Sequence, residues 1–158
     1  MRRQMNMRRP LAGPSTATPE EIRATAEKFF SAYRMLDVKV DVIPPKVVCL
    51  AMAVELILKA LLAAERTGYG RVHSLHALFE ELSDASKEKI LKRMDAPRAE
   101  FLQRLAEEET AEAFIRWRYI YEVPPGDAGN TWTGCLNQLY TSATTVLQGM
   151  LGTPAAGD

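Results

Sequence analysis

The segment Val47–Leu62 is apolar on almost every side of a helix, and only Glu55 and Lys59 interrupt it with charge. A helix without a polar face has to be covered by neighbouring segments over most of its surface. We therefore expect residues 44–66 to form the long central helix of a bundle. A charge in such a helix must be paired or solvated, so Glu55 and Lys59 mark either a structural network or a site.

The same segment has nearly the length of a membrane-spanning helix. However, Glu55 and Lys59 would each cost about 2.5–3.5 kcal/mol near the centre of a bilayer. This cost argues against a transmembrane helix. The first residues also do not form a targeting signal, because no apolar run follows their arginines. We expect a cytoplasmic protein.

Apolar residues at helical spacing predict the rest of the fold, which is all-α. Thr18, Pro19 and Glu21 form a capping-box start for a first helix, and Ser83 or Asp84 caps a later one. The alternating residues 38–42 have no partner strand and are expected to form an extended connector. The expected helices cover residues 19–36, 44–66, 74–82, 84–94, 97–122 with an interruption near 107–110, and about 130–152.

These segments predict a single-domain bundle of five to six helices over residues 18–152. Residues 1–17 are expected to be a disordered, Arg-rich tail, and residues 153–158 a flexible C-terminus. The chain holds 20 basic and 20 acidic residues, and four of the basic ones lie within residues 1–9, which contain no acid. The remainder is therefore net acidic and lacks the basic excess of a general nucleic-acid binder.

Three short patterns occur in order along the chain: Glu55-Leu-x-x-Lys59, His73-x-Leu75 and Arg118-Tyr-x-Tyr-Glu122. Together they span roughly residues 44–122, and their order and spacing resemble the HEPN superfamily. The resemblance implies a helical module associated with RNA or nucleotides and a homodimer. It also implies a place in toxin–antitoxin or phage-defence systems, where a partner protein is a further candidate ligand.

In nuclease members of that superfamily, an arginine is followed four to six residues later by a histidine near the final helices. Here the only histidines, His73 and His76, precede Arg116. Cleavage of RNA through its 2′-hydroxyl needs a group that moves protons near neutral pH, whereas arginine only stabilises phosphate charge. We therefore expect no catalytic residue and no histidine-dependent ribonuclease activity. The enzymatic alternative is an unorthodox, metal-independent ribonuclease.

We expect Glu55 to lie within ion-pair reach of Arg116 or Arg118, because a carboxylate among apolar neighbours needs a partner. Three interpretations stay open: an anion-binding module that uses Lys59 and the two arginines, a dimeric scaffold in which the network only sets the packing, and the ribonuclease. The candidate network or ligand-binding residues are Glu55, Lys59, His73, Arg116, Arg118, Tyr119, Tyr121 and Glu122.

The two cysteines, Cys49 and Cys135, lie among apolar residues of expected helices, where a thiol behaves as a small hydrophobe. With His73 and His76 they make a formal Cys2His2 set, but no Cys-x-x-Cys hairpin is present. We expect neither a metal nor a cofactor.

Overall fold

The computed structural model describes residues 17–37, 43–94, 97–107 and 133–152. All of its regular elements in these ranges are α-helices, so the all-α prediction is confirmed. The helices are α1 (Pro19–Asp37), α2 (Ile43–Ala64), α3 (Leu75–Glu80), α4 (Asp84–Arg93), α5 (Arg98–Ala106) and α8 (Thr133–Leu151). The predicted tail up to residue 16, the connector 38–42 and the end from residue 153 lie outside the described residues.

The start of α1 shows how local chemistry sets a helix boundary. The Thr18 backbone N–H donates to Glu21 Oε2 at 2.8 Å, and the Glu21 N–H donates to Thr18 Oγ1 at 3.2 Å. Each residue thus satisfies a backbone donor that the first turn leaves without a partner. The predicted capping box is confirmed. Of the two residues predicted to cap α4, Ser83 is the N-cap, and its hydroxyl accepts from the Ser86 N–H.

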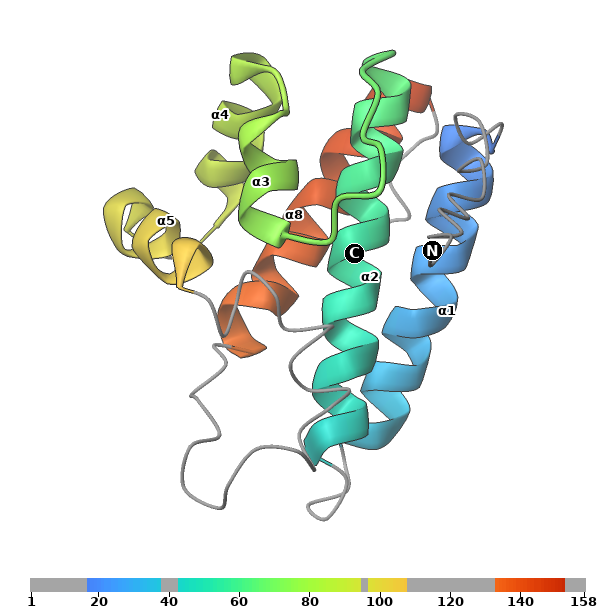
Figure 1. Ribbon diagram of the computed structural model, residues 1–158, viewed down its shortest axis with the longest axis vertical. Coiled ribbons are helices and arrows are strands. Elements are labelled where there is room, and N and C mark those ends of the chain that lie inside the picture. The colour runs from blue at the N-terminus through green and yellow to red at the C-terminus, as the bar shows by residue number, and fades with distance from the viewer. Residues whose placement is uncertain (1–16, 38–42, 95–96, 108–132, 153–158) are drawn as a thin grey trace, which may run out of the picture.

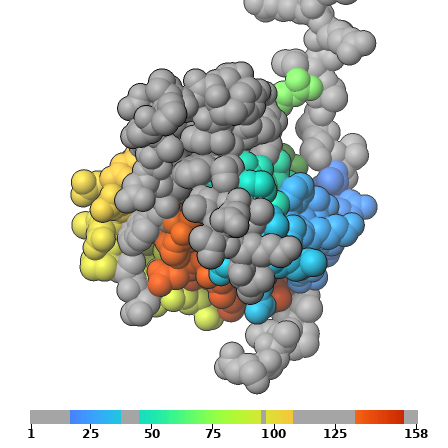
Figure 2. Space-filling view, turned by 90° about the horizontal axis from the view of Figure 1, so that it is seen from below, coloured from blue at the N-terminus to red at the C-terminus, as the bar shows by residue number. Residues whose placement is uncertain are grey.

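Helix α2 is the central element, with α1 antiparallel beside it and α8 packed against it (Figure 1). Seen from below, α8 lies between α1 on one side and α4 and α5 on the other (Figure 2). The core consists largely of side chains from α2 and α8 that are fully buried. These include Leu50, Val54, Ile57, Leu58, Leu61, Leu62, Leu136, Leu139 and Leu147. Each such side chain contributes about 1.5–3 kcal/mol by leaving water.

Segment Pro45–Ala64 of α2 is long and apolar enough to cross a membrane, with a mean hydropathy of 2.3. It is the one such helix in the part of the chain that the structure describes. In the bundle, 67% of its most apolar window is buried. This burial is consistent with the core helix of a soluble protein, because neighbouring helices cover the surface that lipid would otherwise cover.

The end of α2 differs from the prediction. The helix ends at Ala64, and Arg66 follows in the left-handed region with φ of 59°. The Thr67 N–H donates to the Leu62 carbonyl at 2.8 Å, and the Arg66 N–H donates to the Ala63 carbonyl at 3.0 Å. These two bonds define a Schellman motif, which usually places glycine where Arg66 stands.

Candidate functional site

The charged pair of α2 is buried in the bundle. Lys59 Nζ donates to Glu55 Oε1 at 2.7 Å, and only 3% of the Glu55 side chain and 11% of the Lys59 side chain are exposed. The pair forms because residues four apart lie on the same face of a helix. It lies on the C-terminal half of the most apolar helix, so its two charges have to be compensated within the protein.

His73 joins this pair from the loop between α2 and α3. Its Nδ1 lies 3.0 Å from Glu55 Oε1. An ionised carboxylate only accepts hydrogen bonds, so Nδ1 carries the proton in this contact. The His73 side chain is 46% exposed, and the contact therefore connects a buried carboxylate to the protein surface.

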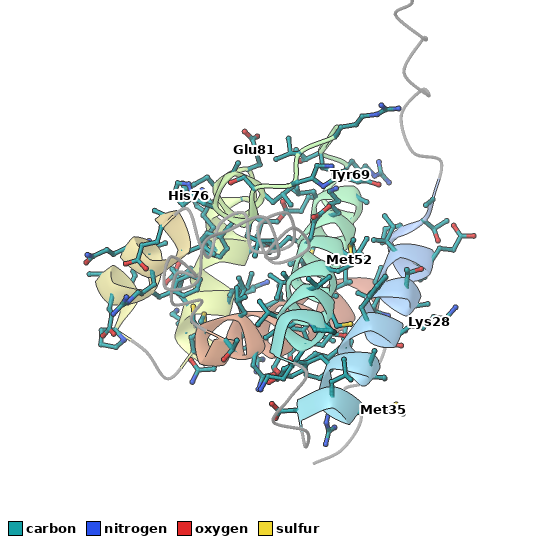
Figure 3. All side chains as sticks on the ribbon, turned by 60° about the horizontal axis from the view of Figure 1, so that its bottom comes forward. Lys28, Met35, Met52, Tyr69, His76 and Glu81 are labelled. Atoms are coloured by element: carbon teal, nitrogen blue, oxygen red, sulfur yellow. The ribbon has the colours of Figure 1, made fainter. Side chains whose placement is uncertain are left out.

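Tyr69, from the same loop, completes the group. Lys59 Nζ lies 5.7 Å from the centroid of the Tyr69 ring, which is within the range of a cation–π interaction. Figure 3 places Tyr69 at the C-terminal end of α2. We call Glu55, Lys59, Tyr69 and His73 the α2 network.

The α2 network still has hydrogen-bonding capacity. Glu55 Oε2 is buried and has no hydrogen-bond partner among the described residues. Lys59 carries three N–H donors, and Glu55 takes one of them. The network therefore offers an acceptor and donors side by side, next to an aromatic ring.

The sequence predicted three of these four residues as one group, and the structure brings Glu55, Lys59 and His73 together. Tyr69 was not predicted, although its position between Gly68 and Gly70 was a signal of an aromatic residue on an open turn. The other candidates lie outside the described residues, and with them the expected contact of Glu55 to an arginine. They are Arg116, Arg118, Tyr119, Tyr121 and Glu122.

A second polar cluster, around Glu65, joins α2 to α4. Glu65 accepts hydrogen bonds from the Ser83 hydroxyl at 2.6 Å, the Ser83 N–H at 3.1 Å and the Ser86 hydroxyl at 2.5 Å. Burial alone would raise the pKa of Glu65, but the hydrogen bonds from Ser83 and Ser86, with the charge of Lys87, outweigh it and lower the pKa. Glu65 is thus ionised and links the end of α2 to the N-terminus of α4. We call these contacts of Glu65 with Ser83 and Ser86 the Glu65 clamp.

The residues of the formal Cys2His2 set lie on different elements: Cys49 on α2, Cys135 on α8, His76 on α3 and His73 in the loop. Within the described ranges, no three His, Cys, Asp or Glu side chains come together as metal ligands. Burial raises the pKa of Cys135 to about 12 and also raises that of Cys49. Both thiols are therefore protonated at neutral pH and poor as nucleophiles.

Comparison of the chain with protein-family models, with curated proteins and with solved structures gives no match.

Proposed function

We propose that this chain is a HEPN-like helical module that binds RNA or a nucleotide through the α2 network, without histidine-dependent ribonuclease activity. The observation that supports this proposal is the buried Glu55–Lys59 pair, which reaches the surface through His73. A buried ion pair adds little net stability, and apolar residues of similar volume often serve as well or better. A role beyond stability would explain its presence in the core helix, and we assign this role to ligand binding.

The chemistry of the α2 network suits this ligand class. The remaining N–H donors of Lys59 match phosphate or carbonyl oxygens. The unpartnered Glu55 Oε2 is an acceptor of the kind that an N–H group of a nucleobase needs, and a base would reach this buried atom only after the side chains over it move. A nucleotide carries both kinds of group, as does a single-stranded RNA segment.

The test compares the wild type with a Glu55→Leu/Lys59→Met double variant, which removes both charges and keeps the apolar core filled. We expect the wild type to bind a fluorescein-labelled 12-nucleotide RNA or a labelled nucleotide in fluorescence anisotropy, and the double variant to lose this binding while it stays folded. A Glu27→Ala variant, which breaks an exposed ion pair of α1, is the matched control. Equal binding by the wild type and the double variant would contradict the proposal.

A second candidate function is the unorthodox ribonuclease, and the Glu55–His73 contact is the observation that favours it. A carboxylate that holds the Nδ1 proton of an imidazole is the arrangement of many general bases. We expect no cleavage of single-stranded RNA in a metal-free assay. Cleavage that disappears in a His73→Ala variant would favour the ribonuclease instead.

The proposal includes a cytoplasmic homodimer that acts in a toxin–antitoxin or defence system, as the HEPN resemblance implies. A symmetric dimer would give a light-scattering mass of about twice the single-chain value of 17.6 kDa. A mass near 17.6 kDa at micromolar concentration would contradict it.

A further inference from the structure

The loop that joins α2 to α3 carries two arginines that the α2 network does not use. Arg66 and Arg71 are exposed, and neither has an ion-pair partner among the described residues. Several cations elsewhere in the bundle are paired, such as Arg23 with Glu27 and Lys92 with Glu88. The loop thus presents two positive charges that no described carboxylate neutralises.

The acidic residues near this loop are engaged elsewhere. Glu65 directly precedes Arg66, but its carboxylate accepts hydrogen bonds from Ser83 and Ser86 at the start of α4. Glu55 is occupied by Lys59 and His73. The nearest carboxylates in sequence and in the α2 network therefore form no ion pair with either guanidinium group.

The backbone conformation of Arg66 also supports a functional role for this loop. Its φ of 59° lies in the left-handed region, which is unfavourable for any residue with a Cβ and which glycine adopts freely. A cation at the C-terminal end of α2 does interact favourably with the helix dipole. However, a lysine or arginine in the last turn of α2 would do so without this conformation. Backbone strain of this kind is often retained at functional positions.

The loop also has room for a ligand. A Cβ added to Gly68 or Gly70 would meet no atom within 4 Å, so a bound strand can approach the backbone closely at both positions. Tyr69 between them is only partly buried. The loop thus carries an aromatic residue between two arginines in the sequence, and aromatic and basic residues together are typical of segments that bind single-stranded nucleic acid.

We propose that the α2–α3 loop binds the phosphates of a single-stranded RNA segment through Arg66 and Arg71, with a base against Tyr69. The inference rests on the proposed function and adds the contact surface and the type of recognition. Because the contacts are to phosphate and to the face of a base, binding should tolerate changes in RNA sequence.

The test uses the full chain and an Arg66→Gly/Arg71→Ala double variant. Glycine removes the guanidinium and also relieves the left-handed backbone, so the variant should unfold at a urea concentration equal to or above that of the wild type. Its matched control is Lys28→Ala/Arg34→Ala, which removes two exposed cations from α1. Figure 3 shows Lys28 on α1, well away from Tyr69.

Binding of labelled 12-nucleotide oligo-U and oligo-A is measured by anisotropy at several KCl concentrations. We expect the loop variant to bind both RNAs roughly tenfold or more weakly. The slope of log K against log salt should fall by about 1.4, because each lost contact to a single strand contributes about 0.7. A Tyr69→Leu variant should lose roughly fivefold or more for both RNAs.

The outcomes separate the loop from the proposed function. An unchanged affinity and salt slope in the loop variant would overturn the loop proposal while RNA binding by the α2 network stands. Equal losses in the loop variant and the α1 control would also overturn it, because they indicate non-specific attraction. No binding of any RNA or nucleotide by the wild type would overturn both proposals. If ATP displaces RNA from the wild type, the loop makes the same phosphate contacts, and a free nucleotide can supply the phosphates in place of RNA.

Discussion

Replacing the buried ion pair of α2 one residue at a time tests the central feature of the structure. Glu55→Leu keeps the core filled but leaves the Lys59 ammonium without its carboxylate, at a position where 11% of the side chain is exposed. Removing one partner of a buried pair costs about 3–5 kcal/mol. The long lysine stem can carry the charge toward water, so we expect the lower value, about 3 kcal/mol.

Lys59→Met leaves the Glu55 carboxylate without its ammonium partner. The Glu55 side chain is only 3% exposed and shorter, so it reaches water less easily, although His73 still donates to it. We expect a loss of about 3–4 kcal/mol within the same range. The double variant has no charge left to strand, and its free energy of unfolding should be equal to that of the wild type or higher by about 1–4 kcal/mol.

The assay is urea denaturation followed by circular dichroism at 222 nm, at one protein concentration for all variants because a dimer would make the midpoint concentration-dependent. With a slope of about 2 kcal/mol per molar urea, a loss of 3 kcal/mol moves the midpoint by about 1.5 M. The exposed Glu27→Ala control should change stability by less than about 0.5 kcal/mol. Two results would refute the buried pair. One is a double variant whose loss in free energy of unfolding equals the sum of the two single losses, and the other is a Glu55→Leu midpoint equal to that of the wild type.

Two further predictions concern the other polar groups. Glu65→Ala should cost about 1–3 kcal/mol at pH 7, because it removes the acceptor of Ser83 and Ser86. The pKa of Glu65 is lowered in the folded state from its ordinary value of 4.5, so its ionised form stabilises the fold above about pH 4.5. This contribution disappears as the pH falls through the lowered pKa. Urea melts at a series of pH values should therefore show that the difference in free energy of unfolding between the wild type and Glu65→Ala becomes smaller below pH 4.5. A difference that stays constant with pH would contradict the stabilising role of ionised Glu65. Cys135, with its pKa of about 12, should be about one part in ten thousand thiolate at pH 8. Mass spectrometry after iodoacetamide treatment of the native protein should find Cys135 unmodified. Fast alkylation would contradict this prediction, because it would show that the Cys135 thiol reaches solvent in the folded protein.

The sequence predicted features that depend on neighbours along the chain. The Thr18–Glu21 capping box and the Ser83 N-cap were predictable because donor and acceptor lie three residues apart. The Glu55–Lys59 pair is compatible with the spacing of one helical turn, although the partner predicted for Glu55 was an arginine. Such contacts need only the helix itself, and the periodic apolar residues predict the helix.

Other features depend on the path of the chain in space. The contact of His73 with Glu55 crosses 18 residues and requires the α2–α3 loop to fold back along α2. Arg66 shows no sign in the sequence of its left-handed conformation, which glycine would have signalled, so the helix end was placed about two residues late. The clamp of Glu65 on Ser83 and Ser86 likewise has no local signature.

The α2–α3 loop is fastened at both of its ends. At one end, the Schellman bonds of Arg66 and Thr67 and the clamp of Glu65 hold the backbone. At the other, His73 contacts Glu55 and Ser74 caps α3. A ligand that binds between these anchors meets a preorganised surface and loses less conformational entropy than it would on a free loop. The two glycines then leave conformational freedom only at the centre of the loop. The affinity for a ligand should therefore depend on the stability of the contacts that α2 and α4 make with the two ends of the loop.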